Sequence, residues 1–85
     1  MPAKKKIPDK VVKPLDNRML KVAEKIKELR QSAGFTSSET FSYQYELSRV
    51  HYWRLEKGMN LTLESLLKIL DIHGITLEEF FKGMK

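Results

Sequence analysis

Two arginines and a tryptophan, Arg49, Arg54 and Trp53, stand close together between Ser48 and Gly58. Each guanidinium carries five N–H donors in a fixed plane and can bond two acceptors at once. An aromatic ring beside such groups can stack on a flat, partly apolar surface. This combination is typical of protein surfaces that bind nucleic acid, where guanidinium groups bond base edges or phosphates.

The residues around these side chains predict a short helix that would hold them in place. Ser48 is a good N-cap, because its hydroxyl can accept a hydrogen bond from an unpaired backbone N–H. Gly58 is a good terminator, because glycine adopts the left-handed conformation without steric cost. Tyr52 and Leu55 are three positions apart and would face the core, which leaves Arg49, Val50, Trp53 and Arg54 on the other faces and His51 between them. A short, capped helix of this kind fits the major groove of DNA.

The chain lacks the side chains and spacings that catalysis or metal binding would require. It has no Cys, no Gly-rich loop before a helix, and no Asp, Glu or His cluster with metal-ligand spacing. We interpret His51 as a surface or phosphate-side group. His73 precedes Gly74 at a predicted helix end, where an imidazolium would suit the helix dipole, and we interpret it as structural. We therefore expect no enzymatic activity, no metal, no cofactor and no small-molecule ligand.

Composition and charge narrow the class of protein further. The 85 residues include 16 Lys and Arg against 11 Asp and Glu, which gives a net charge of +5. Most of the basic residues precede residue 59. This distribution favours a phosphate-binding face, although lysines that only keep the protein soluble are an equal alternative. No apolar run approaches the ~20 residues of a membrane span, and no signal-peptide core follows the N-terminal lysines. We expect a small cytoplasmic protein without membrane contact.

Residues 1–15 predict a disordered basic arm. Three prolines oppose helix formation there, because proline lacks the N–H that a helix interior requires. Five lysines accompany them, among them Lys4, Lys5 and Lys6, and could follow a nucleic-acid backbone. A solubilising tail is an equal alternative. We divide the chain into this flexible arm and a folded domain over residues 16–85.

The first predicted helix contains one residue that does not suit its apolar face. The helical period begins at Asp16 or Asn17, either of which can cap a helix, and ends at Gly34. Arg30 falls on the stripe that otherwise consists of apolar residues. An arginine is almost never buried without a partner, so Arg30 requires a carboxylate nearby.

The next segment has two possible interpretations. Residues 41–47 alternate strictly, which by period alone predicts a strand. Thr36 and Glu39, however, have the spacing of a capping box that opens a helix. Because a single strand would have no partner elsewhere in the chain, we predict a helix here.

Two further helices complete an all-α chain of five helices. Thr62 can cap a helix that ends at His73, and Thr76 and Glu79 have capping-box spacing before a final short helix. The apolar residues expected to lie at the centre of the core from the first of these helices are Leu63, Leu66, Leu67, Ile69 and Leu70.

The order of these features resembles the lambda-repressor-like, Cro-type (XRE) helix-turn-helix domain over residues 17–81. The matching motifs are Lys27-Glu-Leu-Arg30, Gly34-Phe-Thr36, Ser48-Arg49, Leu55-Glu56-Lys57-Gly58, Leu63-x-x-Leu66-Leu67-x-Ile69-Leu70 and Ile75-Thr-Leu-Glu-Glu-Phe80-Phe81. Each motif is short, but the ordered set at compatible spacings is a strong signal. The resemblance implies a compact five-helix domain that binds double-stranded DNA with its third helix.

The resemblance also implies roles for individual residues. Arg30 and Glu56 match an arginine and a glutamate that pair between the first helix and the end of the third. Arg49, Val50 and Arg54 stand at positions that face base edges. The residues expected to contact or flank the DNA backbone are Ser38, Ser48, His51, Trp53, Lys57 and Gly58, together with Lys4, Lys5 and Lys6.

Alternatives remain open on this surface. Taken alone, Arg49 and Arg54 could be ordinary solvated arginines. Within the resemblance we prefer base contact, because a guanidinium can bond guanine O6 and N7 together. Val50 could be a loosely packed surface residue or could touch a thymine methyl. Trp53 could stack along the sugar-phosphate backbone or pad the helix against a neighbour.

The sequence departs from the family pattern at three points. Glu46 stands where the family usually has a glycine with φ > 0, which costs other residues about 1 kcal/mol. The stretch from Gly34 to Glu56 is one residue longer than usual. Ser42 replaces a small alanine and still permits close helix packing.

These features together predict a sequence-specific transcription regulator. We favour a repressor whose third helix reads a palindromic operator as a homodimer. The dimer contact is expected at the C-terminal helix, through Phe80, Phe81 and Met84, because a short terminal helix cannot bury all three. The alternative is an antitoxin-like or adaptor module that uses the same fold mainly to bind another protein.

Overall fold

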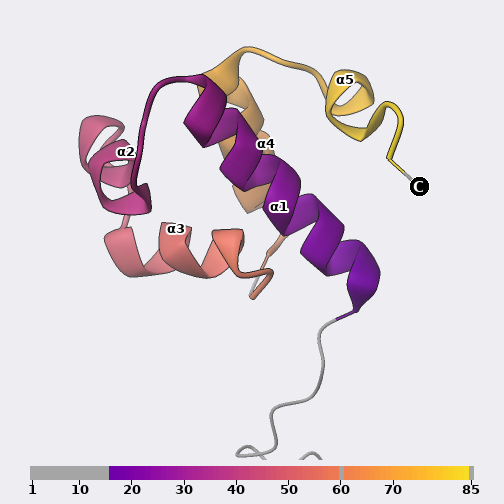
Figure 1. The fold of residues 1–85 in the computed structure, drawn as a ribbon, viewed down its shortest axis with the longest axis horizontal. Helices are drawn as coiled ribbons and strands as arrows, with labels where there is room; N and C mark the ends of the chain where they lie inside the picture. Colours follow the sequence, from indigo (N-terminus) through magenta and orange to yellow (C-terminus); the bar gives the residue numbers. More distant parts are fainter. Residues whose placement is uncertain (1–15, 60, 85) are drawn as a thin grey trace, which may run out of the picture.

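The computed structural model describes residues 16–59 and 61–84; the predicted basic arm, with Lys4, Lys5 and Lys6, lies outside these ranges. Within them the chain forms five helices and no strand (Figure 1). The helices are α1 (Asn17–Ser32), α2 (Ser38–Gln44), α3 (Arg49–Glu56), α4 (Leu63–His73) and α5 (Leu77–Phe81). The prediction of an all-α fold with five helices is confirmed.

Polar caps open four of the helices at the positions that the sequence predicts. In each case a side-chain oxygen accepts a hydrogen bond from a backbone N–H that has no partner within the helix. The caps are Asp16 for α1, Ser48 for α3, Thr62 for α4 and Thr76 for α5. Thr76 and Glu79 form a complete capping box. These caps set where each element begins.

The start of α2 differs from the prediction by one residue. Ser37, not Thr36, is the N-cap, and its hydroxyl accepts a hydrogen bond from the Thr40 N–H at 3.1 Å. The segment is helical despite its alternating pattern. The alternation arises because Tyr43 and Tyr45 are exposed aromatic side chains, so they do not mark a buried face. Because Thr36 and Ser37 both carry a hydroxyl, the sequence alone does not show which of them caps the helix.

Four helices end with the same backbone motif, in which the chain turns through a residue with positive φ. At α1, α3 and α4 this residue is a glycine. At α2 it is Glu46, with φ 57°, and the following Leu47 N–H bonds the Ser42 carbonyl at 2.8 Å. Glu46, which replaces the family glycine, therefore adopts the left-handed conformation. This conformation costs a non-glycine residue about 1–2 kcal/mol of folding free energy.

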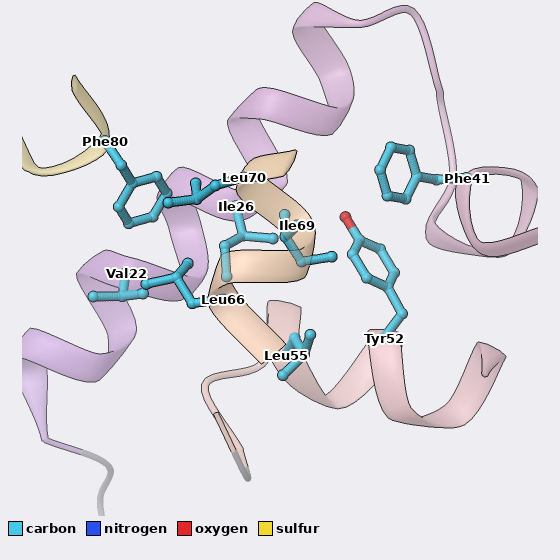
Figure 2. Packing of buried hydrophobic residues seen from close by; sticks show 9 residues of the cluster. All are labelled: Val22, Ile26, Phe41, Tyr52, Leu55, Leu66, Ile69, Leu70 and Phe80. Carbon is cyan, nitrogen blue, oxygen red and sulfur yellow. The ribbon is translucent and has the colours of Figure 1, made fainter. Parts of the chain in front are cut away.

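The hydrophobic core runs from α5 to the α2–α3 pair. In Figure 2, Phe80 lies with Val22 at one end of the cluster, and Phe41 and Tyr52 lie at the other, with Ile26 between them. Figure 1 shows α4 crossing behind α1, and α3 packs against both α1 and α2. Because α1 and α4 form the centre of this core, they provide the support on which α2 and α3 are held.

Two apolar residues of α4 do not lie where the sequence predicts. Leu66, Ile69 and Leu70 are buried, but Leu63 and Leu67 are exposed. They are four positions apart and therefore share one side of the helix. The apolar face of α4 is thus wider than the core that it covers. No helix among residues 16–59 and 61–84 is long and apolar enough to cross a membrane.

Candidate nucleic-acid interface

The position of α3 is fixed by two side chains on its inner face. Tyr52 and Leu55 are almost fully buried, in line with their predicted three-residue spacing. Burial of the Leu55 side chain contributes about 1.5–3 kcal/mol, and the Tyr52 ring packs against Phe41 with ring centres 4.9 Å apart. The other faces carry exposed residues, which are Arg49, Val50, His51, Trp53 and Arg54. The buried side chains therefore hold α3 against the core, while its two arginines remain exposed to solvent.

Arg49 meets a carboxylate from the neighbouring helix. Its Nη1 lies 3.5 Å from Oε2 of Glu39, the second residue of α2. The two side chains are 67% and 70% exposed, so water screens the pair, and its contribution to stability is about 0–1 kcal/mol. Sequence reasoning missed Glu39 as part of this surface, because the two residues are ten positions apart and meet only when α2 and α3 pack.

Arg49 and Glu39 border a shallow hollow between α2 and α3. The hollow is also lined by Ser38, Val50 and Trp53. The structure thus brings together three predicted contact residues from α3 and one from the start of α2. Arg54 is exposed on α3 but does not line this hollow.

Trp53 lies on the outer face, next to a basic residue. The Lys57 Nζ lies 5.3 Å from the centre of the Trp53 ring, within the range of a cation–π interaction. The ring is partly exposed and lines the hollow beside Val50. This position leaves one part of the indole accessible to a bound molecule.

His51 joins α3 to the start of α4. Its Nε2 lies 3.1 Å from the Ser65 hydroxyl, and Ser65 also receives a hydrogen bond from the Thr62 hydroxyl at 3.0 Å. The Ser48 hydroxyl in turn accepts the His51 N–H at 3.2 Å. His51 is exposed, as predicted for a surface group. The role of Ser65 had no signal in the sequence, because it depends on how α3 and α4 meet.

The structure brings Arg30 and Glu56 together at the other end of α3. Arg30 Nε and Nη2 donate to the two carboxylate oxygens of Glu56 at 2.7 and 3.2 Å. The side chains are only 5% and 7% exposed, and the bond to Glu56 raises the pKa of Arg30. Arg30 Nη1 also donates to the Phe35 carbonyl at 2.8 Å. The arginine on the apolar stripe of α1 therefore has the carboxylate that the sequence requires.

Two further predicted residues lie near this framework. Gly58 is buried at the end of α3 and has φ 82°. His73 is partly buried at the end of α4 and stacks on Phe41, with ring centres 5.3 Å apart. Burial lowers the pKa of His73, which favours the neutral ring. The expectation of an imidazolium at this helix end is therefore not supported, although the residue is structural as predicted.

The predicted dimer residues separate into buried and exposed ones. Phe80 is 0% exposed and belongs to the core, so its prediction as a dimer contact is wrong. In Figure 2 the Phe80 ring lies beside Leu70, at the same end of the core as Val22. Met84 packs partly against the core, whereas Phe81 is 41% exposed. Leu77, four positions before Phe81, is 39% exposed on the same side of α5.

A curated protein from Mycoplasma sp, named Control protein C.MunI, is similar to this chain along most of its length. The two are 36% identical over 67 residues, which covers 78% of this chain and 90% of that protein. No protein-family model and no solved structure matches the chain. From this similarity and the five-helix arrangement, the chain belongs to the lambda-repressor-like, Cro-type (XRE) family of helix-turn-helix DNA-binding transcription regulators.

Proposed function

We propose that this protein is a repressor-type control protein that binds a palindromic operator with α3 in the major groove. The observation that carries the proposal is the division of α3 into two faces. Tyr52 and Leu55 are buried, while Arg49, Val50 and Arg54 are exposed. The name of the Mycoplasma relative, a control protein, supports a regulatory role.

The two arginines cannot read the same base. They are five positions apart, so their side chains leave the helix in directions about 140° apart. Arg49 begins the helix and reaches deepest into the groove, where its guanidinium bonds a guanine. Arg54 contacts an adjacent base or its phosphate. Val50, next to Arg49, is placed to touch a thymine methyl.

Backbone contacts would come from both sides of this reading surface. Lys57 carries a charge at the end of α3, and its position over Trp53 keeps the ammonium on the outer face. Ser38 offers a hydroxyl at the start of α2, and His51 and Ser48 lie beside the first turn of α3. Such contacts set the register of the protein on DNA without reading its sequence.

A second copy of the chain is proposed to pack against α5. Leu77 and Phe81 share one side of this helix and are both partly exposed. An apolar pair at the surface of so small a chain suits an isologous contact between two subunits. The dimer would place its two copies of α3 on half-sites about one helical turn apart.

The proposal is tested by selection from a randomised duplex library, followed by titration at several salt concentrations. Enrichment of a palindrome whose binding weakens with salt is the expected result. Arg49→Ala should relax one base pair in each half-site. Lys82→Ala is the charge-matched control, because Lys82 caps the end of α5, a helix that lies far from α3 in Figure 1. Since Lys82 adjoins Phe81, sedimentation should first show that this variant has the same oligomeric state as the unchanged chain. Binding without sequence preference would favour the adaptor module instead.

A further inference from the structure

Glu39 places a negative charge on a surface that otherwise suits a polyanion. It lies in the first turn of α2, is 70% exposed, and borders the hollow that Val50 and Trp53 line. Phosphates near this position would repel its carboxylate. A carboxylate in the first turn interacts favourably with the positive end of the helix dipole, which is a structural reason for an acid at this position. The contact of this carboxylate with Arg49 is a second reason for an acid at this position.

The contact with Glu39 leaves the most useful edge of Arg49 free. Glu39 Oε2 meets only the Nη1 group, at 3.5 Å. The remaining Nε and Nη2 donors form the fork that bonds two acceptors side by side. The same molecule shows how this fork is used, since Arg30 holds both Glu56 oxygens with Nε and Nη2 while Nη1 bonds the Phe35 carbonyl. In Arg49, by comparison, Nη1 already has an acceptor in Glu39, and the Nε and Nη2 donors remain available.

Guanine O6 and N7 are the pair of acceptors that fits this empty fork in a major groove. Holding Arg49 at Nη1 reduces the side-chain freedom that binding would otherwise remove. The Glu39 carboxylate also acts on the neighbouring base pair, because an ionised carboxylate only accepts hydrogen bonds. It would repel guanine O6 and N7 or thymine O4 if that base faced it, and would accept a hydrogen bond from the amino group of a cytosine or adenine in the same place.

We propose that Glu39 is a specificity-determining residue that orients Arg49 toward a guanine and disfavours guanine or thymine as the base that faces it in the adjacent pair. The proposal rests on the function proposed above, in which α3 reads the major groove. It assigns α2 a part in choosing the sequence as well as in holding the backbone. Glu39 acts on the guanine through Arg49, so for that base it is a positioning residue.

The test is selection from a randomised duplex library with the full chain and with the Glu39→Gln and Arg49→Ala variants. Glutamine both donates and accepts, so Glu39→Gln should reduce discrimination at the base pair next to the guanine by about fivefold or more, the low end of the cost of a mismatched pair. It should also raise affinity for all sequences, because one negative charge is lost. Glu28→Gln removes the same charge on α1, beside Lys82, and should leave every base preference unchanged.

The outcomes separate this inference from the proposed function. If Arg49→Ala does not change the selected sequence, α3 is not the reader and the proposed function fails. If Arg49→Ala relaxes the guanine while Glu39→Gln only raises overall affinity, Glu39 serves the helix dipole alone and this inference is overturned. Denaturant unfolding of Glu39→Gln measures the dipole effect separately, and base preference is the readout that a purely structural role would not move.

Discussion

The two ends of α3 are each joined to a neighbouring helix by an arginine–glutamate pair, and the two pairs differ in burial and geometry. At the end of the helix, Glu56 is held by Arg30 through two hydrogen bonds, with both side chains at least 93% buried. At its beginning, Arg49 meets Glu39 at a single longer contact, with both side chains mostly exposed. An arginine–glutamate pair is therefore part of the buried framework at the end of α3 and part of the exposed surface at its beginning.

The difference shows how one short helix can be both anchored and available. A buried charge that loses its partner is left without solvent, so the pair at the end of α3 acts as a fixed joint to α1. The exposed pair at the beginning of α3 contributes little to stability, so Arg49 can bind a ligand with its other donors without disturbing the fold. The end of α3 that carries Arg49, the proposed base-reading residue, is therefore the end with the exposed pair.

Breaking the buried pair should have the largest effect. Arg30→Met or Glu56→Leu alone should lower the free energy of unfolding by about 3–5 kcal/mol, because each leaves a buried charge unpaired. The double variant should lose much less than the sum, since neither charge remains. A double-mutant cycle by denaturant unfolding measures this coupling. Strictly additive single effects would contradict the pairing.

Removing the exposed arginine should affect DNA binding and leave stability almost unchanged. Arg49→Ala should weaken operator binding by about 1–3 kcal/mol, because a guanine contact is lost. Its free energy of unfolding should change by at most about 1 kcal/mol, because only the exposed pair with Glu39 is lost. Titration with the operator and denaturant unfolding of the same variant provide the two numbers. A stability loss comparable to that of Arg30→Met would remove the contrast between the two ends.

The turn that carries α2 into α3 can be stabilised without touching either pair. Glu46 has φ 57°, and Glu46→Gly should relieve the strain while making the unfolded chain more flexible. The net gain should be at most about 1 kcal/mol in the free energy of unfolding. Glu46→Ala removes the same charge but keeps the strained conformation, so it should show no gain. Equal stability of the two variants would mean that charge, not backbone conformation, matters here.

Mild acid should destabilise the core at His73. Burial lowers the pKa of His73 below its ordinary 6.5, so below about pH 6.5 the unfolded chain binds a proton that the folded chain does not. Stability should therefore fall as the pH decreases through this range. His73→Phe, which keeps the stack on Phe41, should fall less steeply in unfolding measured from pH 7 to 5. Asp16, whose pKa Arg18 lowers to about 2, responds only at more acidic pH. An unchanged slope in His73→Phe would contradict this assignment.

The sequence predicted features that depend on near neighbours better than features that depend on packing. Capping residues and glycines gave four helix starts and the ends of α1, α3 and α4, because these signals lie within a few residues. Arg30 is a charged residue on an otherwise apolar helix face, and this position predicted a nearby carboxylate. The contact between Arg49 and Glu39 had no such signal, since it depends on the angle between two helices. Phe80 was misassigned because periodicity alone does not show which side of a five-residue helix meets the core.

The two-sided construction of α3 has a consequence for how such a protein can change during evolution. Only Tyr52, Leu55 and Glu56 tie the helix to the rest of the molecule through buried side chains. Substitutions at its exposed positions should alter stability by at most about 1 kcal/mol each. A lineage could therefore replace the exposed residues one at a time and pass through folded intermediates throughout. New target sites would be reachable by small steps on an unchanged scaffold.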